Sequence, residues 1–451
     1  MDIISIVRGM FGILLIVAIA YLFSNNKKNI DWKLVVVGLL FQFFIAIFII
    51  KGEVLGSYFA PLGWIKEGFK FVSGVFVLIL NFTGEGSKFI FGNLGISPGK
   101  NGSMGMFFAF QVLPIIIFFA SLMSVLYHLG IMQRIVQAMA WIMSKTMGTS
   151  GAESLSVSAN IFVGQTEAPL MIKPFLKELT KSELLTVMTG GMATIAGSVM
   201  AAYIQILSYS FADAMHIALK DAQLLFATHL LGASVMAAPA ALVISKILFP
   251  ETKEPKTKGT VKVEIEKNAS NPIEAAAIGA SEGVQLAINV AAMLIAFIAL
   301  IALVNYMLQG IGNLAGINSY LIAHFGKPLS LQFILGYILQ YLAFAIGVPW
   351  HSAMDFGSLI GTKVILNEFV AYSDMSNLIK IKELVDDKTI LMATYALCGF
   401  ANFSSIAIQI GGISPIAPNQ RKNLAELGLR AVLAGSLATL MTATLAGILF
   451  S

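Results

Sequence analysis

The chain has 451 residues, of which 57% are hydrophobic and only 12% are charged. Soluble proteins average about 25% charged residues, so the composition excludes an ordinary water-soluble enzyme. The net charge of +5 does not indicate nucleic-acid binding, because the basic residues are scattered over polar loops, where the positive-inside rule explains them better. The single cysteine, Cys398, lies in an apolar segment and excludes an intrachain disulfide.

Apolar segments recur along the whole chain. A helix needs about 20 predominantly apolar residues to cross a bilayer, and the sequence offers such segments at 4–23, 34–50, 105–127, 184–208, 222–249, 284–308 and 431–450. They predict an all-α, polytopic membrane protein. The first segment is interpreted as a retained helix, since it is too long for the core of a signal peptide.

The basic residues also predict an orientation. With the N-terminus outside, three basic stretches face the cytoplasm: Lys27 with Lys28, the polar linker 251–272, and the loop that carries Arg421. The positive-inside rule favours this arrangement. It places both termini outside, although the stretch 380–388 then carries three lysines on the outer side, beside three acidic residues.

The linker separates two halves that show a partial repeat. The stretch "IVQAMAW" at 135–141 resembles "ILQYLAF" at 338–344, and each is followed by a turn, a short apolar segment and a glutamate. Further on, "ATIA" at 193–196 resembles "SSIA" at 404–407. Three matches in the same order indicate two copies, and an odd number of crossings between them would make the repeat inverted.

The two glutamates are Glu167 and Glu368. The segments that flank them have roughly 10–14 residues, too few to cross a bilayer alone, so we predict re-entrant hairpins at about 152–178 and 352–378. A carboxylate at the centre of a spanning helix costs about 2.5–3.5 kcal/mol, which indicates a functional role for both residues.

The tip of the first hairpin reads "GQTEAPL". Gly164 permits a break in the chain, Thr166 is placed to cap the second half-helix, and Pro169 suits its first turn. The tip then presents the amide of Gln165, a hydroxyl and the carboxylate of Glu167 to one small volume. This set suits a neutral, polar, planar ligand that has both donors and acceptors.

A later helix, "YALCGFANFSSIAIQIGG", places Asn402 and Ser405 on one face, where both could meet Glu368. Hydrogen bonds between helices explain Asn402 and Ser405 equally well on residue type alone, and Phe400 is more often a packing residue. A cation site at this depth is expected to use oxygen atoms. Candidates are the side chains of Asn160 and Thr194 and the carbonyl groups of Val163 and Ile195.

Four motifs together resemble the signature segments of the concentrative nucleoside transporter family: "SANIFVGQTEAPLMIKPF", "TGGMATIAGSV", "GTKVILNEFVAY" and "ALCGFANFSSIAIQIGG". The resemblance runs through essentially the whole chain. It implies a subunit of about eight transmembrane helices plus two opposed re-entrant hairpins in an inverted repeat. It also implies a homotrimer that imports nucleosides such as uridine by an elevator-type movement, coupled to a cation gradient and without an organic cofactor.

The resemblance assigns roles to individual residues. Nucleobase contacts are implied for Gln165, Thr166 and Glu167, with Gly164 and Val199 beside them. Ribose contacts are implied for Glu368, Asn402 and Ser405, with Phe400 lining the site. The sodium site is implied at Asn160, Val163, Thr194 and Ile195, where Thr194 stands in place of a serine common in relatives and keeps the hydroxyl.

The resemblance also divides the chain. The expected parts are scaffold helices at 1–130, a first repeat at 131–250, a cytoplasmic linker at 251–272, a scaffold helix at 273–328 and a second repeat at 329–451. The expected location is the cytoplasmic (inner) membrane.

Three alternatives stay open on sequence alone. The glutamates keep proton coupling open in place of sodium. They could also form the acid and base of an intramembrane hydrolase, although the sequence shows no metal ligands beside them. A channel would need a continuous polar path rather than two opposed tips.

Overall fold

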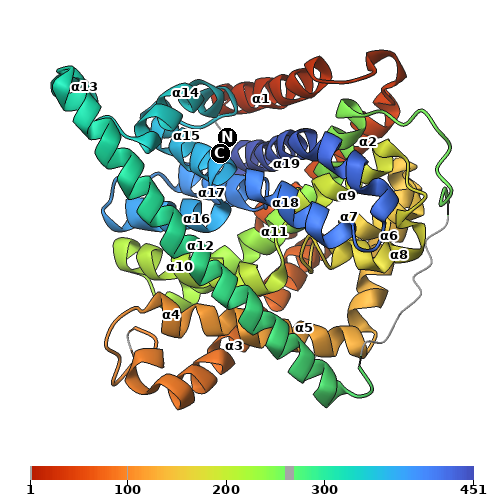
Figure 1. Cartoon of the computed structure of the whole chain (residues 1–451), viewed down its shortest axis with the longest axis horizontal. Helices are drawn as coiled ribbons and strands as arrows, with labels where there is room; N and C mark the ends of the chain where they lie inside the picture. The colour runs from red at the N-terminus through yellow and green to blue at the C-terminus, as the bar shows by residue number, and fades with distance from the viewer. Residues whose placement is uncertain (1–2, 99, 260–268, 451) are drawn as a thin grey trace.

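The computed structural model describes residues 3–98, 100–259 and 269–450, and the regular elements within these ranges are all helical (Figure 1). Part of the predicted linker 251–272, namely 260–268, lies outside the described residues.

The predicted apolar segments are confirmed as helices. Seven helices or helix pairs among the described residues are long and apolar enough to cross a membrane. They are α1 (Ile3–Leu22), α2 (Trp32–Tyr58), α4 with α5 (Phe108–Gln111, Leu113–His128), α9 with α10 (Lys181–Ala193, Gly197–Met215), α11 (Leu219–Leu248), α12 (Pro272–Leu314) and α19 (Arg421–Phe450). The helices α17 (Asp387–Leu397) and α18 (Phe403–Ile413) follow one another across a short break, and α18 is apolar but short.

The remaining helices are shorter or more polar. They are α3 (Ala60–Phe91), α6 (Ile131–Met147), α7 (Gly151–Ala159), α8 (Lys173–Leu176), α13 (Ile317–Phe325), α14 (Leu331–Ala345), α15 (Trp350–Ile365) and α16 (Glu368–Lys380), with the 3-10 helices η1 (Lys27–Asn29), η2 (Gly92–Gly95), η3 (Ala168–Ile172) and η4 (Pro418–Gln420).

Both predicted hairpins contain two arms that meet at a tip. In hairpin 1, α7 runs to the tip and η3 with α8 returns. In hairpin 2, α15 follows α14 at an angle of 119° and α16 returns. The predicted cap at Thr166 is wrong, because Glu167 occupies the N-cap position of η3 and makes no capping bond there. The amides of Glu167 and Ala168 donate to the Gly164 carbonyl instead.

The order of elements is the same in the two halves. Each hairpin is preceded by the helix that carries the matched seven residues, and is followed by a broken helix and then by a 30-residue helix, α11 or α19. The third sequence match is wrong in register. "ATIA" spans the break between α9 and α10, whereas "SSIA" lies inside α18, beyond the break at 398–402. The continuous helix predicted through Asn402 is therefore also wrong.

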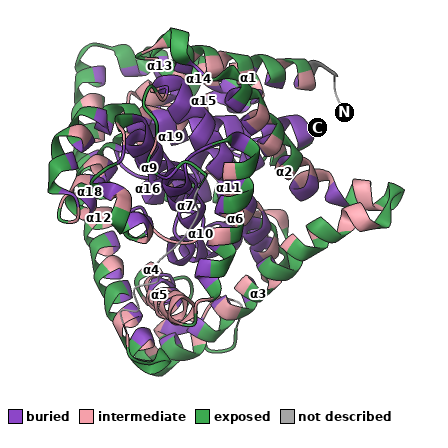
Figure 2. Cartoon of the chain, turned by 90° about the vertical axis from the view of Figure 1, so that its right-hand side faces the viewer, coloured by how far each residue is buried: buried purple, intermediate pink, exposed green. Residues whose placement is uncertain are grey.

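The helices form an inner and an outer group. The most apolar stretch of α9–α10 is entirely buried inside the chain and those of α11 and α19 are 89% buried, whereas that of α12 is only 17% buried. Figure 2 shows the buried residues gathered at the centre of the molecule, with α3 and α12 at its margin. The long helix α12 packs along α5 and crosses the face of the inner group (Figure 1).

A buried polar network fastens the base of hairpin 1 to the inner group. The ammonium of Lys246 on α11 lies 2.7 Å from a carboxylate oxygen of Glu153 on α7, and both side chains are almost fully buried. The hydroxyl of Ser150 donates to the carboxylate of Glu183 at 2.7 Å. Thr257 in the linker accepts from the first two amides of α7 through its carbonyl and its hydroxyl. Hairpin 1, α9 and α11 are therefore held as one unit.

We expect Lys246→Met to destabilise the protein by about 3–5 kcal/mol, because it leaves the buried Glu153 carboxylate without its partner. Lys256→Met is the matched control, since Lys256 pairs with Glu178 on the surface, where an ion pair contributes only about 0–1 kcal/mol. Thermal unfolding in detergent measures both. Equal melting temperatures for the two variants would contradict this account of the network.

Candidate functional site

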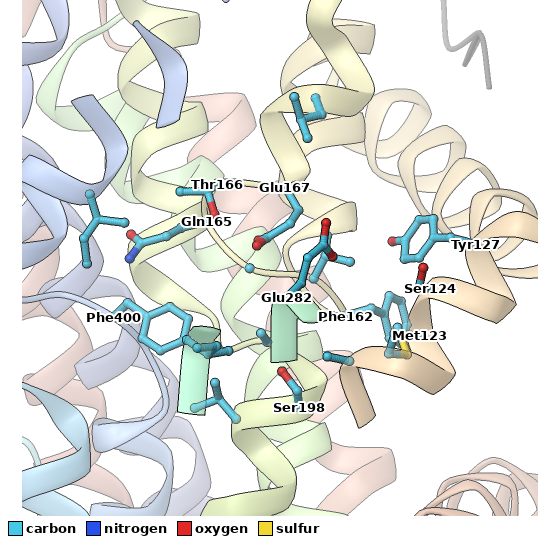
Figure 3. Close-up of a pocket in the computed structure, with 18 of the residues that line it drawn as sticks. Met123, Ser124, Tyr127, Phe162, Gln165, Thr166, Glu167, Ser198, Glu282 and Phe400 are labelled. Carbon is cyan, nitrogen blue, oxygen red and sulfur yellow. The ribbon is translucent and has the colours of Figure 1, made fainter. Parts of the chain in front are cut away.

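A cavity of about 660 Å³ lies between the two hairpin ends and the outer helices α5 and α12. Figure 3 shows part of its lining, with Gln165 and Phe400 on one side and Tyr127 and Ser124 on the other. All nine predicted substrate-site residues line it: Gly164, Gln165, Thr166, Glu167, Val199, Glu368, Phe400, Asn402 and Ser405. The structure therefore brings together residues that lie more than 200 positions apart in the chain.

Hairpin 1 presents its polar tip to this cavity. Gln165 is buried, whereas the Glu167 side chain is exposed to the cavity. A Cβ atom added to Gly164 would lie 2.2 Å from a carboxylate oxygen of Glu167. The carboxylate is the end of a flexible, exposed side chain, so a larger residue at position 164 would displace the Glu167 carboxylate without straining the backbone.

Hairpin 2 presents a buried carboxylate. Glu368 begins α16, directly after the N-cap residue Asn367, and its side chain is almost fully buried. The Tyr203 hydroxyl donates to one carboxylate oxygen at 2.9 Å, and the Asn402 amide donates to the other at 3.0 Å. Both oxygens are thereby fixed in position, and the helix N-terminus favours their negative charge.

The break between α17 and α18 orients Asn402. This residue is the N-cap of α18, where its carbonyl oxygen accepts from the amide of Ser405 at 2.9 Å. Its side-chain amide is then free to reach Glu368. The predicted contact between Asn402 and Glu368 is confirmed.

The predicted contact between Ser405 and Glu368 is wrong. The Ser405 hydroxyl instead accepts from the Gln165 amide at 3.2 Å, and the Gln165 carbonyl accepts from Gln409 at 3.1 Å. Gln409 also donates to the Met188 carbonyl at 3.0 Å. The hairpin 1 tip is thus joined to α18 and α9 by hydrogen bonds.

The four predicted cation ligands lie where hairpin 1 meets the break between α9 and α10. Asn160 is the C-cap of α7 and Thr194 is the C-cap of α9, and both are buried. The Phe162 carbonyl accepts from Gly197 at 2.9 Å, which holds the end of hairpin 1 against the start of α10.

The hydrogen bonds of this region fit a cation. The Asn160 amide donates to the Ser156 carbonyl, while its oxygen is buried and accepts from no group. Among the described residues, the carbonyls of Val163 and Ile195 also accept no backbone hydrogen bond. A buried oxygen that accepts no hydrogen bond is available to a ligand, and carbonyl and side-chain oxygens without a carboxylate suit a monovalent cation. The described residues contain no group of three or more His, Cys, Asp or Glu that could hold a metal ion.

The sequence analysis missed several residues of the site. Tyr203, which holds Glu368, and Gln409, which holds Gln165, lie in helical segments where no spacing singled them out. Asn367 was also missed, although its side-chain amide nitrogen is buried without an acceptor at the cavity. Glu282 of α12 lines the wall opposite hairpin 1. A polar residue inside an apolar stretch was the only available signal for Gln409 and Glu282.

Comparison with known proteins identifies relatives across the chain. Three family profiles match: "Na+ dependent nucleoside transporter N-terminus" at 11–94, "Nucleoside recognition" at 109–210 and "Na+ dependent nucleoside transporter C-terminus" at 229–447. The Bacillus subtilis (strain 168) protein "Uncharacterized transporter YutK" is 44% identical, with 98% of this chain and 99% of the relative aligned. "Sodium/nucleoside cotransporter 1" of Homo sapiens is 40% identical over 97% of this chain and 63% of its own length.

Solved structures agree with the sequence matches. The transporter CNTnw in an inward-facing substrate-bound state is 39% identical, covers 99% of both chains and superposes with a TM-score of 0.82. A variant of CNTnw in an outward-facing state covers 99% of this chain and 98% of its own, also at 39% identity, with a TM-score of 0.85. The overall arrangement of helices is therefore shared with these proteins.

Proposed function

The chain belongs to the family of Na+-dependent nucleoside transporters, the concentrative nucleoside transporters, and on that premise we propose how its residues carry out transport. It is a sodium-coupled symporter that imports nucleosides and is not an enzyme. The observation that supports the residue roles is the meeting of two polar hairpin ends at one cavity. A nucleoside is neutral and carries donors and acceptors on both base and sugar, which matches this lining.

We assign the base and the sugar to different hairpins. Gln165, Thr166 and Glu167 of hairpin 1 would receive the donors and acceptors of the base edge, beside Gly164 and the apolar Val199. Glu368 would accept from ribose hydroxyls, because Tyr203 and Asn402 fix both of its oxygens while each oxygen retains a further lone pair.

The remaining site residues would complete the sugar end. Ser405 lies beside Asn402 at the start of α18, and its hydroxyl accepts from Gln165 in this structure. The Ser405 hydroxyl would either accept from a sugar hydroxyl in place of Gln165, or keep that bond and donate its own hydrogen to a sugar oxygen. Phe400 offers an apolar face in the break before α18.

Sodium would bind at Asn160, Val163, Thr194 and Ile195. The unpartnered oxygen of Asn160 supports this assignment. Val163 directly precedes Gly164, so a cation that joins its carbonyl to Thr194 would pin the hairpin 1 tip to the break between α9 and α10. Sodium would thereby preorganise the base-binding groups. By linkage, the nucleoside must then raise sodium affinity by the same factor.

An apolar contact closes one side of the site. Leu366 and Val370 of hairpin 2 pack on Ile301, with Leu294 and Phe297 beside them. The cavity extends in the other direction, since its lining on α12 runs from Met293 toward the N-terminal end of that helix and reaches Ala269 of the linker. With the linker in the cytoplasm, the described conformation opens inward.

We propose an elevator-type movement for the change to the outward-facing state. The two hairpins, α9–α11 and α17–α19 would move as one inner unit against α5 and α12. The buried network at the base of hairpin 1 supports this division, because it ties that hairpin to α9 and α11 rather than to the outer helices. The proposed domains at 131–250 and 329–451 contain this unit together with α6 and α14, which directly precede the hairpins.

The cellular arrangement is proposed on the same basis. The protein would lie in the cytoplasmic membrane with both termini outside, as its basic loops favour, and would assemble as a homotrimer. Light scattering of the detergent-solubilised protein tests the oligomeric state. Modification of cysteines introduced at each terminus in intact cells tests the orientation.

Uptake of labelled uridine into proteoliposomes, with sodium and proton gradients imposed separately, tests the function. Accumulation driven by sodium alone is the expected result. Accumulation driven by a proton gradient alone would show that protons are the coupling ion. The absence of accumulation with either gradient would contradict the proposed transport function. Competition by a series of unlabelled nucleosides then measures base preference and tolerance of deoxyribose.

We expect Glu368→Gln to weaken uridine binding about tenfold to hundredfold, because it removes a hydrogen bond between a hydroxyl and a charged group worth about 1.5–3 kcal/mol. A uridine analogue without the secondary ribose hydroxyls should bind this variant and the unchanged protein alike. Glu426→Gln, at a surface ion pair, is the control. Unchanged uridine affinity in the Glu368 variant would refute the assignment.

We expect Asn160→Ala to raise the sodium concentration for half-maximal uptake about tenfold, which corresponds to about 1.4 kcal/mol. Uridine affinity at saturating sodium should change less. The control is Asn377→Ala, at an exposed position of hairpin 2. If half-saturation by sodium does not move, the cation binds elsewhere.

Two adjacent glycines of α18 test the role of Thr166. A Cβ atom at Gly412 would lie 2.7 Å from the Thr166 methyl group, whereas one at Gly411 would meet nothing within 4 Å. We expect Gly412→Ala to displace the hairpin 1 tip and weaken uridine binding by a factor on the order of ten, and Gly411→Ala to leave binding unchanged. Equal affinities in the two variants would remove Thr166 from the base-binding groups.

A further inference from the structure

Hairpin 2 contains a buried cation that the transport mechanism above does not use. Lys363 lies in the last turn of α15 and is 1% exposed. Its ammonium donates to the carbonyl of Ala396 at 2.8 Å and to the hydroxyl of Thr439 at 3.0 Å. These two groups belong to the end of α17 and to α19, so one side chain joins three elements of the second repeat.

The surroundings of this ammonium are unusual for a lysine. Buried charges are generally paired with an opposite charge, yet no carboxylate lies within 4 Å of the Lys363 ammonium among the ion pairs of the described residues. Its acceptors are a carbonyl at a helix end and a hydroxyl. Carbonyls at the C-terminal ends of broken helices and side-chain oxygens are the groups that membrane transporters use to bind Na+.

The same two kinds of element meet in the first repeat. There, Asn160 ends α7 and Thr194 ends α9, where the broken helix is interrupted, and a Cβ atom at Gly190 of α9 would lie 3.4 Å from the Asn160 amide nitrogen. In the second repeat, Lys363 at the end of α15 reaches Ala396 at the end of α17, where the corresponding helix is interrupted. The two breaks also pack together, since a Cβ atom at Gly399 would lie 2.7 Å from the Met192 carbonyl.

The helix breaks of the two repeats differ in whether their oxygen atoms already have a hydrogen-bond donor. In the first repeat, the Asn160 oxygen is buried and accepts from no donor. In the second repeat, the carbonyl and the hydroxyl receive hydrogen bonds from a permanently attached cation. One repeat therefore offers oxygen atoms for an ion, and the other supplies the positive charge from its own side chain.

We propose that the Lys363 ammonium is a resident cation, occupying in the second repeat the position that sodium occupies in the first, so that one sodium ion accompanies each nucleoside. This inference rests on the sodium site proposed above. Lys363 is a positioning residue: it holds the end of α17, and with it the break that carries Asn402, against hairpin 2.

The proposal explains an asymmetry between the two ends of the site. Glu368 has a protein donor on each carboxylate oxygen, as expected where the local cation is always present. The hairpin 1 tip depends on an ion that comes and goes. Sodium would therefore control the base end of the site, while the sugar end stays ordered in every state.

The stoichiometry of the unchanged protein is the first test. In proteoliposomes with a fixed sodium gradient, the membrane potential at which net uridine flux stops is measured at several uridine gradients. For one sodium ion, this potential shifts by about 59 mV per tenfold change in the uridine gradient, and for two ions by about 30 mV. A shift of about 59 mV is expected, and about 30 mV would overturn the proposal.

Variants of Lys363 are the second test. Lys363→Ser removes the ammonium and leaves room beside the Ala396 carbonyl and Thr439, so it should admit a second sodium ion and halve the shift. Lys363→Met keeps an apolar stem without charge and should lose uridine uptake. Lys380→Met, at an exposed position of the same hairpin, is the control and should behave as the unchanged protein does.

Each remaining outcome decides the question. Normal uridine uptake by Lys363→Met would overturn the resident-cation role. So would a transport-active Lys363→Ser whose zero-flux potential still shifts by about 59 mV per tenfold change in the uridine gradient. If the Lys363→Ser variant folds but does not transport uridine, its melting temperature is measured as a function of sodium concentration instead. A dependence that requires two sodium sites supports the proposal, and a dependence that requires one site overturns it. If neither variant folds, the shift of the unchanged protein decides. Uridine uptake that does not depend on the sodium concentration would instead refute the proposed sodium coupling.

Discussion

The absence of water from the bilayer core governs this structure, because every backbone polar group at that depth must find a partner in the protein. Four interruptions of helical backbone occur in the inner group: two hairpin tips and two helix breaks. All four are surrounded by protein or face the cavity. The freed groups are used locally, as where Phe162 accepts from Gly197 and where Asn402 caps α18. The site exists because these interruptions are gathered in one place.

The two ends of the site are built with different degrees of order. Glu368 is buried and receives two hydrogen bonds from side chains on other elements, so it is part of a fixed network. Glu167 is exposed to the cavity on a tip whose second arm is only a 3-10 helix and a four-residue helix. The Glu167 carboxylate can therefore adapt its position to a ligand. The Glu368 carboxylate is held in one position, so a ligand must match that position.

The outer helices line the cavity but do not hold the polar groups of the hairpin tips in place. Glu282 on α12 and Tyr127 on α5 line the wall across from hairpin 1, but no hydrogen bond joins them to the hairpin tips among the described residues. The Tyr127 hydroxyl has no partner. In the proposed elevator movement, a wall that makes no hydrogen bonds to the tips would let the inner unit move past it, whereas hydrogen bonds across it would have to break in each transport cycle.

The amino-acid sequence alone indicated the membrane class, the seven long apolar segments, the two hairpins and the polar tip residues Gln165, Thr166 and Glu167. The resemblance to a known family supplied the full set of nine predicted substrate-site residues. Length, hydropathy and the high cost of a carboxylate in lipid are local properties, so they can be read along the chain. The interruption at 398–402, the pairing of Ser405 with Gln165 and the roles of Tyr203 and Lys363 were decided by the tertiary structure alone. Each depends on a partner on another helix, and residue spacing within an apolar helix does not reveal which neighbour its polar side chain will meet. The chemistry of "GQTEAPL" was therefore predictable, but the groups that hold it in place were not.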